Sequence, residues 1–84
     1  MEIHEPERKL KLIWDFRGPD GARTAKHHAH HLQEFRDSNS LRLNIIGVEE
    51  QSEMHHIAFM VVYESEMPGV RDALKPHRGQ LYSE

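Results

Sequence analysis

Histidines are the residues of this chain whose type and spacing most clearly suggest chemistry. Eight of the 84 residues are histidine. Four of them, His27, His28, His30 and His31, fall within five consecutive positions. Neutral imidazole is a common ligand of transition metals, and its ordinary pKa lies close to physiological pH. A turn this rich in histidine is therefore a candidate for a metal site or for a pH-sensitive surface.

The spacing of these histidines fits one face of a helix. At 100° per residue, His27, His30 and His31 point the same way, with Glu34 one turn after His30. His27 and His31 are four residues apart, at which two side chains on a helix meet. The pattern predicts a zinc, copper or nickel site formed by these three histidines and Glu34. We favour a solvated histidine-rich face, because one helical face supplies only two or three of the ligands that a zinc site needs. We therefore predict no required cofactor.

Basic residues gather near the end of the chain. Arg71, Lys75, His77 and Arg78 fall within eight positions. Cations near the C-terminus of a helix interact favourably with its dipole, so a structural role is sufficient to explain them. The alternative is a site for an acidic small molecule or partner peptide. For that site we predict Arg71, Lys75 and Arg78, together with His28 at the edge of the apolar stripe of its helix.

No arrangement of residues predicts catalysis, and we assign no catalytic residue. The absence of cysteine excludes disulfides, thiolate metal sites and cysteine nucleophiles. Motifs for a serine nucleophile and for a zinc protease helix are missing. The glycines Gly18 and Gly21 precede a predicted helix but lack the spacing of a phosphate-binding loop. A non-enzymatic protein is favoured, with a small-molecule enzyme of the dimeric-barrel kind as an alternative.

The elements that position these residues follow from hydrophobic periodicity. Strict alternation over residues 9 to 17 predicts a strand with Trp14 on its buried face. A Gly-Pro-Asp-Gly turn follows, and Asp20 is the expected side-chain cap of a helix over residues 22 to 37. The remaining predicted elements are strands over 41 to 48, 57 to 64 and 79 to 83, a connection over 49 to 54, and a helix over 65 to 75 capped by Ser65.

Strand, helix, strand, strand, helix, strand is the order of the ferredoxin-like βαββαβ plait, an α+β fold. In it, two helices cover one face of a four-stranded antiparallel sheet. We expect one domain over residues 9 to 84 and a flexible segment over residues 1 to 8. The stretches LIWDFRG (residues 12–18) and ALKPHRG (residues 73–79) also resemble those of small bacterial proteins with this fold and no assigned activity. That resemblance implies the fold and no site residues.

The third strand is apolar on both faces, which predicts that it is central in the sheet or that its second face is covered. If helices cover only one face, we expect the other to expose Ile13, Ala58, Met60 and Val62. Exposed contiguous apolar patches commonly mark interfaces, and a two-fold interface needs a single self-complementary surface. The pattern therefore predicts a homodimer formed through the open sheet face.

Charge and composition limit the partners. The formal net charge of −3 argues against nucleic acid, and we expect Phe59 to be buried beside Trp14 rather than exposed for stacking on bases. No apolar run is long enough for a membrane span, and the acidic start is unlike a signal peptide, so the expected location is the cytoplasm. The leading hypothesis is a small dimeric, non-enzymatic binding or regulatory module whose ligand the sequence does not identify.

Overall fold

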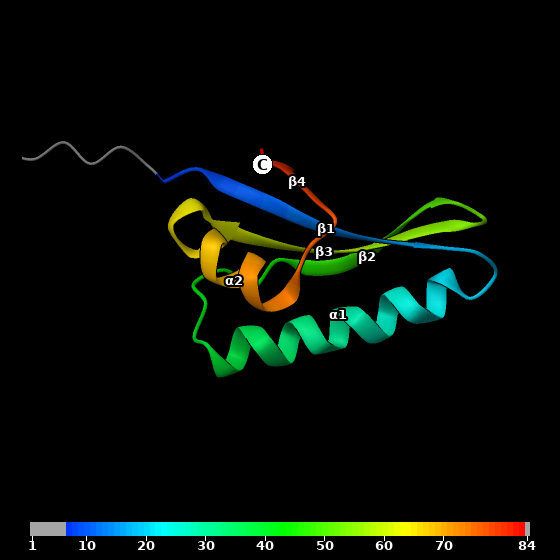
Figure 1. The fold of residues 1–84 in the computed structure, drawn as a ribbon, viewed down its shortest axis with the longest axis horizontal. Coiled ribbons are helices and arrows are strands. Elements are labelled where there is room, and N and C mark those ends of the chain that lie inside the picture. Colours follow the sequence, from blue (N-terminus) through cyan, green and yellow to red (C-terminus); the bar gives the residue numbers. More distant parts are fainter. Residues whose placement is uncertain (1–6, 84) are drawn as a thin grey trace, which may run out of the picture.

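The computed structural model describes residues 7–83. They form an α+β domain with a four-stranded antiparallel sheet and two helices, as expected (Figure 1). In chain order the elements are β1 (Lys9–Arg17), α1 (Gly21–Ser38), β2 (Ile46–Ser52), β3 (His55–Tyr63), the 3-10 turn η1 (Glu64–Glu66), α2 (Met67–Leu74) and β4 (Arg78–Leu81).

The sheet has the strand order β2-β3-β1-β4, and every neighbouring pair is antiparallel. The predicted central position of the third strand is confirmed, because β3 lies between β2 and β1. In the register of β1 and β3, Trp14 lies opposite Ala58 and Leu12 opposite Met60. Side chains directly opposite one another project from the same face of a sheet. This pairing therefore decides which apolar residues share a face.

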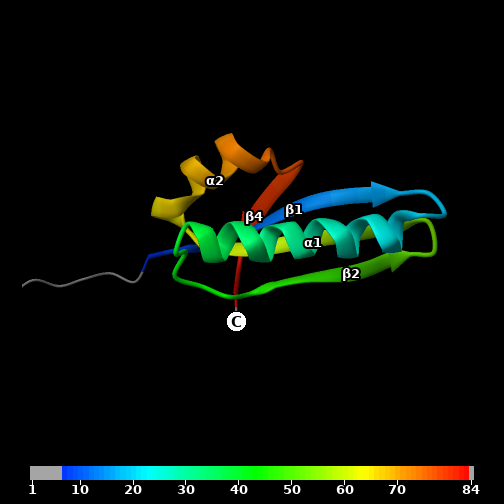
Figure 2. The same ribbon diagram turned by 90° about the horizontal axis from the view of Figure 1, so that it is seen from below.

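The hydrophobic core lies between this sheet and the helices. Trp14 of β1 packs in one cluster with Leu32 of α1 and Val70 of α2, so the two helices cover the same face (Figures 1 and 2). The indole Nε1–H of Trp14 also donates a 2.9 Å hydrogen bond to the carbonyl of Leu74, where α2 ends. The buried members of the cluster are Leu12, Trp14, Ala25, Leu32, Ala58, Met60, Val62 and Val70.

The hairpin of β2 and β3 is longer than predicted. β2 begins at Ile46 rather than at residue 41, and it continues to Ser52, so the expected connection over 49 to 54 is wrong. Glu49 and Glu50 remain in the strand because β2 is an edge strand, whose side chains are largely exposed and tolerate charge. Residues 41 to 45 instead form a loop, in which the carbonyl of Leu43 accepts a bond from Arg36 of α1.

The helix starts also differ from those predicted. Neither helix has a side-chain cap bond, so the expected capping by the carboxylate of Asp20 and by Ser65 is wrong. At α1 the backbone carbonyl of Asp20 accepts instead from the amide of Thr24. At η1, the Glu66 carboxylate accepts from the amide of Tyr63. α2 then begins at Met67 rather than Ser65, because η1 precedes it.

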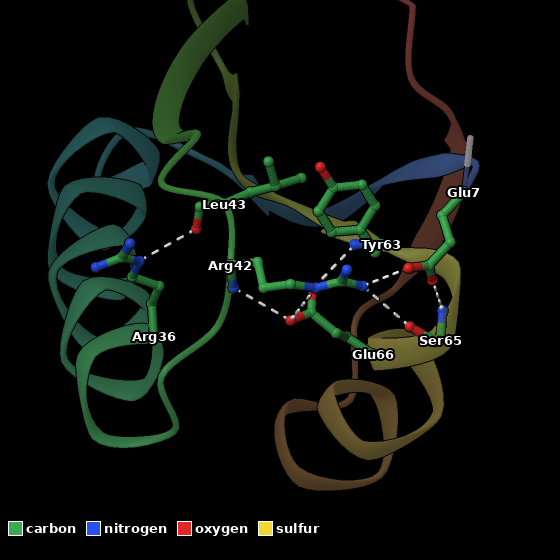
Figure 3. A network of polar contacts seen from close by, with 7 residues as sticks. All are labelled: Glu7, Arg36, Arg42, Leu43, Tyr63, Ser65 and Glu66. Atoms are coloured by element: carbon green, nitrogen blue, oxygen red, sulfur yellow. Dashed lines mark hydrogen bonds and ion pairs between the residues drawn. The ribbon is translucent and has the colours of Figure 1, made fainter. Parts of the chain in front are cut away.

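The side chain of Arg42 joins the loop before β2 to the turn after β3 (Figure 3). The Arg42 guanidinium donates to Glu7 and Ser65 and lies 4.0 Å from the centroid of the Tyr63 ring. Hydrogen bonds from Ser65 and Arg42 lower the pKa of Glu7 to about 2.

Flexibility was expected over residues 1 to 8. Glu7 and Arg8 make specific contacts, Arg8 with Glu64, whereas residues 1–6 lie outside the described part of the chain.

Removing a core side chain tests this packing. We expect Leu32→Ala to lower the free energy of unfolding by about 2–5 kcal/mol, because it leaves a cavity between α1 and the sheet. Leu81→Ala is the matched control: Leu81 is 60% exposed whereas Leu32 is 0% exposed. Its effect should stay within about 0.5 kcal/mol. Urea denaturation followed by circular dichroism measures both, and equal effects would contradict the packing described.

Candidate functional site

His28 lies against the aromatic part of the core rather than among ligand-binding residues. Its ring centroid is 4.9 Å from that of Trp14 and 5.5 Å from that of Phe16. Its Nε2 atom is buried without a hydrogen-bond partner in the protein. Burial, followed by the charges of His31, His77 and His27, lowers its pKa. His28 therefore functions as a neutral aromatic side chain at the edge of the core.

The other three histidines of α1 are exposed, and two of them are hydrogen-bonded to each other. The Nε2 atoms of His27 and His31 are 3.0 Å apart. Nδ1 of His31 is 2.9 Å from the Oε1 atom of Glu34. The predicted set of four ligands does not form: within residues 7–83, no group of three or more histidine, aspartate or glutamate side chains could hold a metal ion. The contact that His30 makes is an edge-on ring contact with His31, at 6.3 Å between centroids.

The predicted dimer face is wrong in three of its four residues. Ala58, Met60 and Val62 lie in the core beneath the helices, because they pair with the inward-facing residues of β1. The helix-free face instead carries Ile13, opposite Phe59. Phe59 therefore lies on the face opposite Trp14, contrary to expectation.

Three apolar residues of the helix-free face are buried within a single chain, and Phe59 is half-buried. Ile13 and Ile57 are each 2% exposed and Val61 is 1% exposed. Over residues 7–83, this face thus lacks the exposed apolar patch on which the dimer hypothesis depended. Association of two chains stays a prediction, without support from this surface.

Two polar bridges cross that face. Nζ of Lys11 on β1 is 2.7 Å from the Glu49 carboxylate on β2, so this contact spans β3. The same nitrogen lies 4.5 Å from the centroid of the Phe59 ring. Asp15 on β1 accepts two 3.0 Å bonds from Arg78 on β4 and contacts His55 on β3 at 2.7 Å. Together the bridges tie all four strands across the side that no helix covers.

Asp15 is held as a carboxylate in this arrangement. Hydrogen bonds from Arg78 and then His55 hold the pKa of Asp15 well below its usual range, although burial opposes them. The backbone amide of Asp15 also donates to Nδ1 of His77 at 2.8 Å. Because its oxygens are occupied and its proton is lost at neutral pH, Asp15 is suited to joining strands and not to general acid catalysis.

A cleft of about 520 Å³ lies between β1, α2 and β4. Apolar side chains form much of its surface, with Leu10 and Leu12 from β1, Met67 from α2 and Leu81 from β4. Three arginines join them. The full lining is Arg8, Leu10, Leu12, Met67, Arg71, Pro76, Arg78, Gly79, Gln80 and Leu81.

The cleft includes two of the four predicted ligand-binding residues. Arg71 and Arg78 line it, whereas Lys75 and His28 do not. Lys75 instead ends α2 in a left-handed backbone conformation, with φ of 50°. The sequence analysis did not predict Arg8 as a cleft residue, because it assigned residue 8 to a flexible segment. Only the pairing of β1 with β4 shows that Arg8 lines the cleft.

Comparisons with known proteins yielded no match among protein families, curated proteins or solved structures. Over residues 7–83, neither helix has the combination of length and apolar character needed to cross a membrane.

The environment of His28 predicts a pH dependence of stability. Because burial lowers the pKa of His28 from its ordinary 6.5, the unfolded chain binds this proton more tightly than the folded chain does. The stability contributed by the neutral ring is thus present above pH 6.5 and is lost as the pH falls from there towards the lowered value. His28→Phe should therefore reduce the loss of stability between neutral and mildly acidic pH.

The free energy of unfolding at several pH values measures this effect, with the same substitution at exposed His30 as the control. His30→Phe should retain the wild-type slope. A slope unchanged by His28→Phe would contradict the neutral, half-buried state of that ring.

Proposed function

We propose that this protein is a small non-enzymatic binding module, and that the cleft between β1, α2 and β4 takes an amphipathic ligand with an acidic group. The observation that carries the proposal is the combination, in one hollow, of an apolar surface from two strands and a helix with three arginine side chains. The apolar part of the ligand would lie on Leu10 and Leu81, and its anionic end beside Arg71.

The size and lining of the cleft support a small-molecule ligand. Sites for such ligands commonly measure about 300–1,000 Å³ and combine an apolar lining with a few polar groups, and the cleft falls in this range at about 520 Å³. Leu81 is a large apolar residue that is 60% exposed. A ligand covering it would remove apolar surface from water, which favours binding.

The charges of the cleft support an anionic group. Arg78 is engaged by Asp15 and Arg8 by Glu64. Arg71, in contrast, makes a 3.3 Å contact with Asp72, its neighbour in sequence, and its side chain is 55% exposed. Such a surface contact contributes little to stability and leaves guanidinium donors in water. A carboxylate or phosphate accepts paired bonds from guanidinium, which makes Arg71 the expected anchor.

We also propose that the domain is a ferredoxin-like plait. In a split βαβ unit, a third strand lies antiparallel between the two strands that a helix connects. The position of β3 between β1 and β2, with α1 connecting those two strands, supports this assignment. The fold alone implies no particular ligand, so the functional proposal depends on the cleft.

Binding of octanoate and of 1-octanol tests the proposed function. Both have the same number of carbon atoms, and only octanoate carries a charge. We expect octanoate to bind more tightly and to shift the backbone amide signals of Gly79 and Leu81 in NMR titrations. Arg71→Gln should weaken octanoate binding by roughly tenfold or more, because a hydrogen bond to a charged group contributes about 1.5–3 kcal/mol, and should leave octanol binding unchanged.

Arg23→Gln is the matched control, since Arg23 is an α1 residue outside the cleft lining. It should bind octanoate as the wild type does. Equal binding of acid and alcohol, or an equal loss in Arg23→Gln, would overturn the role of Arg71. Failure of both probes to perturb the cleft would overturn the proposal itself.

A further inference from the structure

His27 and His31, on the outer face of α1, direct their Nε2 atoms toward one another. His27 and His31 lie one helical turn apart, and their Nε2 atoms converge to 3.0 Å. The rings stand nearly perpendicular, at 85°, with centroids 4.6 Å apart. We propose that this pair binds a divalent transition-metal ion, copper(II) above others, through both Nε2 atoms. The proposal is independent of the cleft, whose lining includes neither residue.

The separation of the two nitrogens is compatible with coordination of one shared metal ion. With metal–nitrogen bonds of about 2.0–2.1 Å, two ligands at 90° stand about 2.9 Å apart, and two at the tetrahedral angle about 3.3 Å apart. The observed 3.0 Å, a hydrogen-bond length in the metal-free chain, falls between these two values, so one ion could bind both nitrogens with little movement of either ring. Adjacent positions at about 90° are typical of square-planar and tetragonal copper(II) and nickel(II) sites. Copper(II) also forms the most stable complexes of the divalent series with nitrogen ligands.

Glu34 contacts His31 on the side of the ring away from His27. Its Oε1 atom lies 2.9 Å from Nδ1 of His31, the ring nitrogen that faces away from His27. When Nδ1–H donates to this carboxylate, the lone pair of His31 is on Nε2, where a metal needs it. In the metal-free state Nε2–H of His27 can then donate to Nε2 of His31. A bound ion would take the place of that proton, and His27 would adopt the tautomer protonated on Nδ1.

The pair is open to solvent, which determines the kind of site. His27 is exposed, and the side chains of His31 and Glu34 are 56% and 60% exposed. Two protein ligands leave other coordination positions for water or a small chelator, so the site suits exchangeable binding rather than a closed structural centre. The ligands come from consecutive turns of one helix, so bound metal should stabilise the helical state.

Copper(II) titration of the full chain tests the proposal. Calorimetry gives the affinity, electron paramagnetic resonance reports nitrogen coordination, and the melting temperature reports stabilisation of the folded chain. Glu34→Gln should weaken binding by about tenfold, at the low end of the range for outer ligands because Glu34 is exposed. His27→Gln and His31→Gln should each weaken it further and remove the rise in melting temperature.

His30→Gln is the matched control, since it removes a neighbouring exposed histidine that the pair does not use. It should leave affinity and spectrum unchanged, and circular dichroism should show all four variants folded. Wild-type affinity in both His27→Gln and His31→Gln would overturn the proposal. An equal loss of copper affinity in His30→Gln would also overturn it, because binding would then depend on the histidine-rich surface as a whole rather than on His27 and His31. Tighter binding of zinc than of copper would overturn the assignment to copper(II).

Discussion

The antiparallel register of β1 against β3 is the constraint on which the other features of this molecule depend. Trp14 opposite Ala58 places the inward side chains of both central strands under the helices. A shift of one residue would reverse the faces of a strand. Ile13 would then meet α1, and Trp14 would lie on the side without helices. The core cluster follows from this alignment, and together with the pairings of β2 with β3 and of β1 with β4 it sets the polar bridges and the cleft.

The register also explains how a domain with only two helices shields two apolar sheet faces. Long polar side chains can cover apolar surface with their aliphatic stems while their charged ends remain in water. The Lys11 ammonium lies over this face, 4.5 Å from the centroid of the Phe59 ring and 2.7 Å from the Glu49 carboxylate. The contact of Asp15 with Arg78 joins β1 to β4 on the same side. The face is therefore completed by charge pairs within one subunit. A second chain is not required to bury Ile13.

Local sequence patterns were sufficient to predict most of the elements but not the register in which the strands pair. The alternation of residues 9 to 17 and the helical periodicity that follows predicted β1 and α1 nearly to the residue. The apolar character of β3 predicted its central place. Because β3 is apolar on both sides, however, its sequence contains no signal that tells one face from the other. The assignment of Met60 and Phe59 to the wrong faces has this origin.

Contacts between distant residues limited the prediction of sites in the same way. The basic segment identified Arg71 and Arg78, but the cleft also needs Leu10, which only the pairing of β1 with β4 brings beside them. The spacing of His27 and His31 was enough to predict their contact, because both lie on one helix. His30 was grouped with them, since helical angles alone do not fix where an imidazole nitrogen points.

The two outer strands bear on how this protein behaves at high concentration. An unpaired strand edge is a template for the growth of intermolecular sheets, which leads to aggregates. β2 carries Glu49 and Glu50 and is interrupted by a register shift between Glu50 and Ser52, while β4 is only four residues long. Charge, irregularity and brevity each discourage the addition of a further strand. The open edges of this small sheet are thus protected against fibril-like assembly by their own sequences.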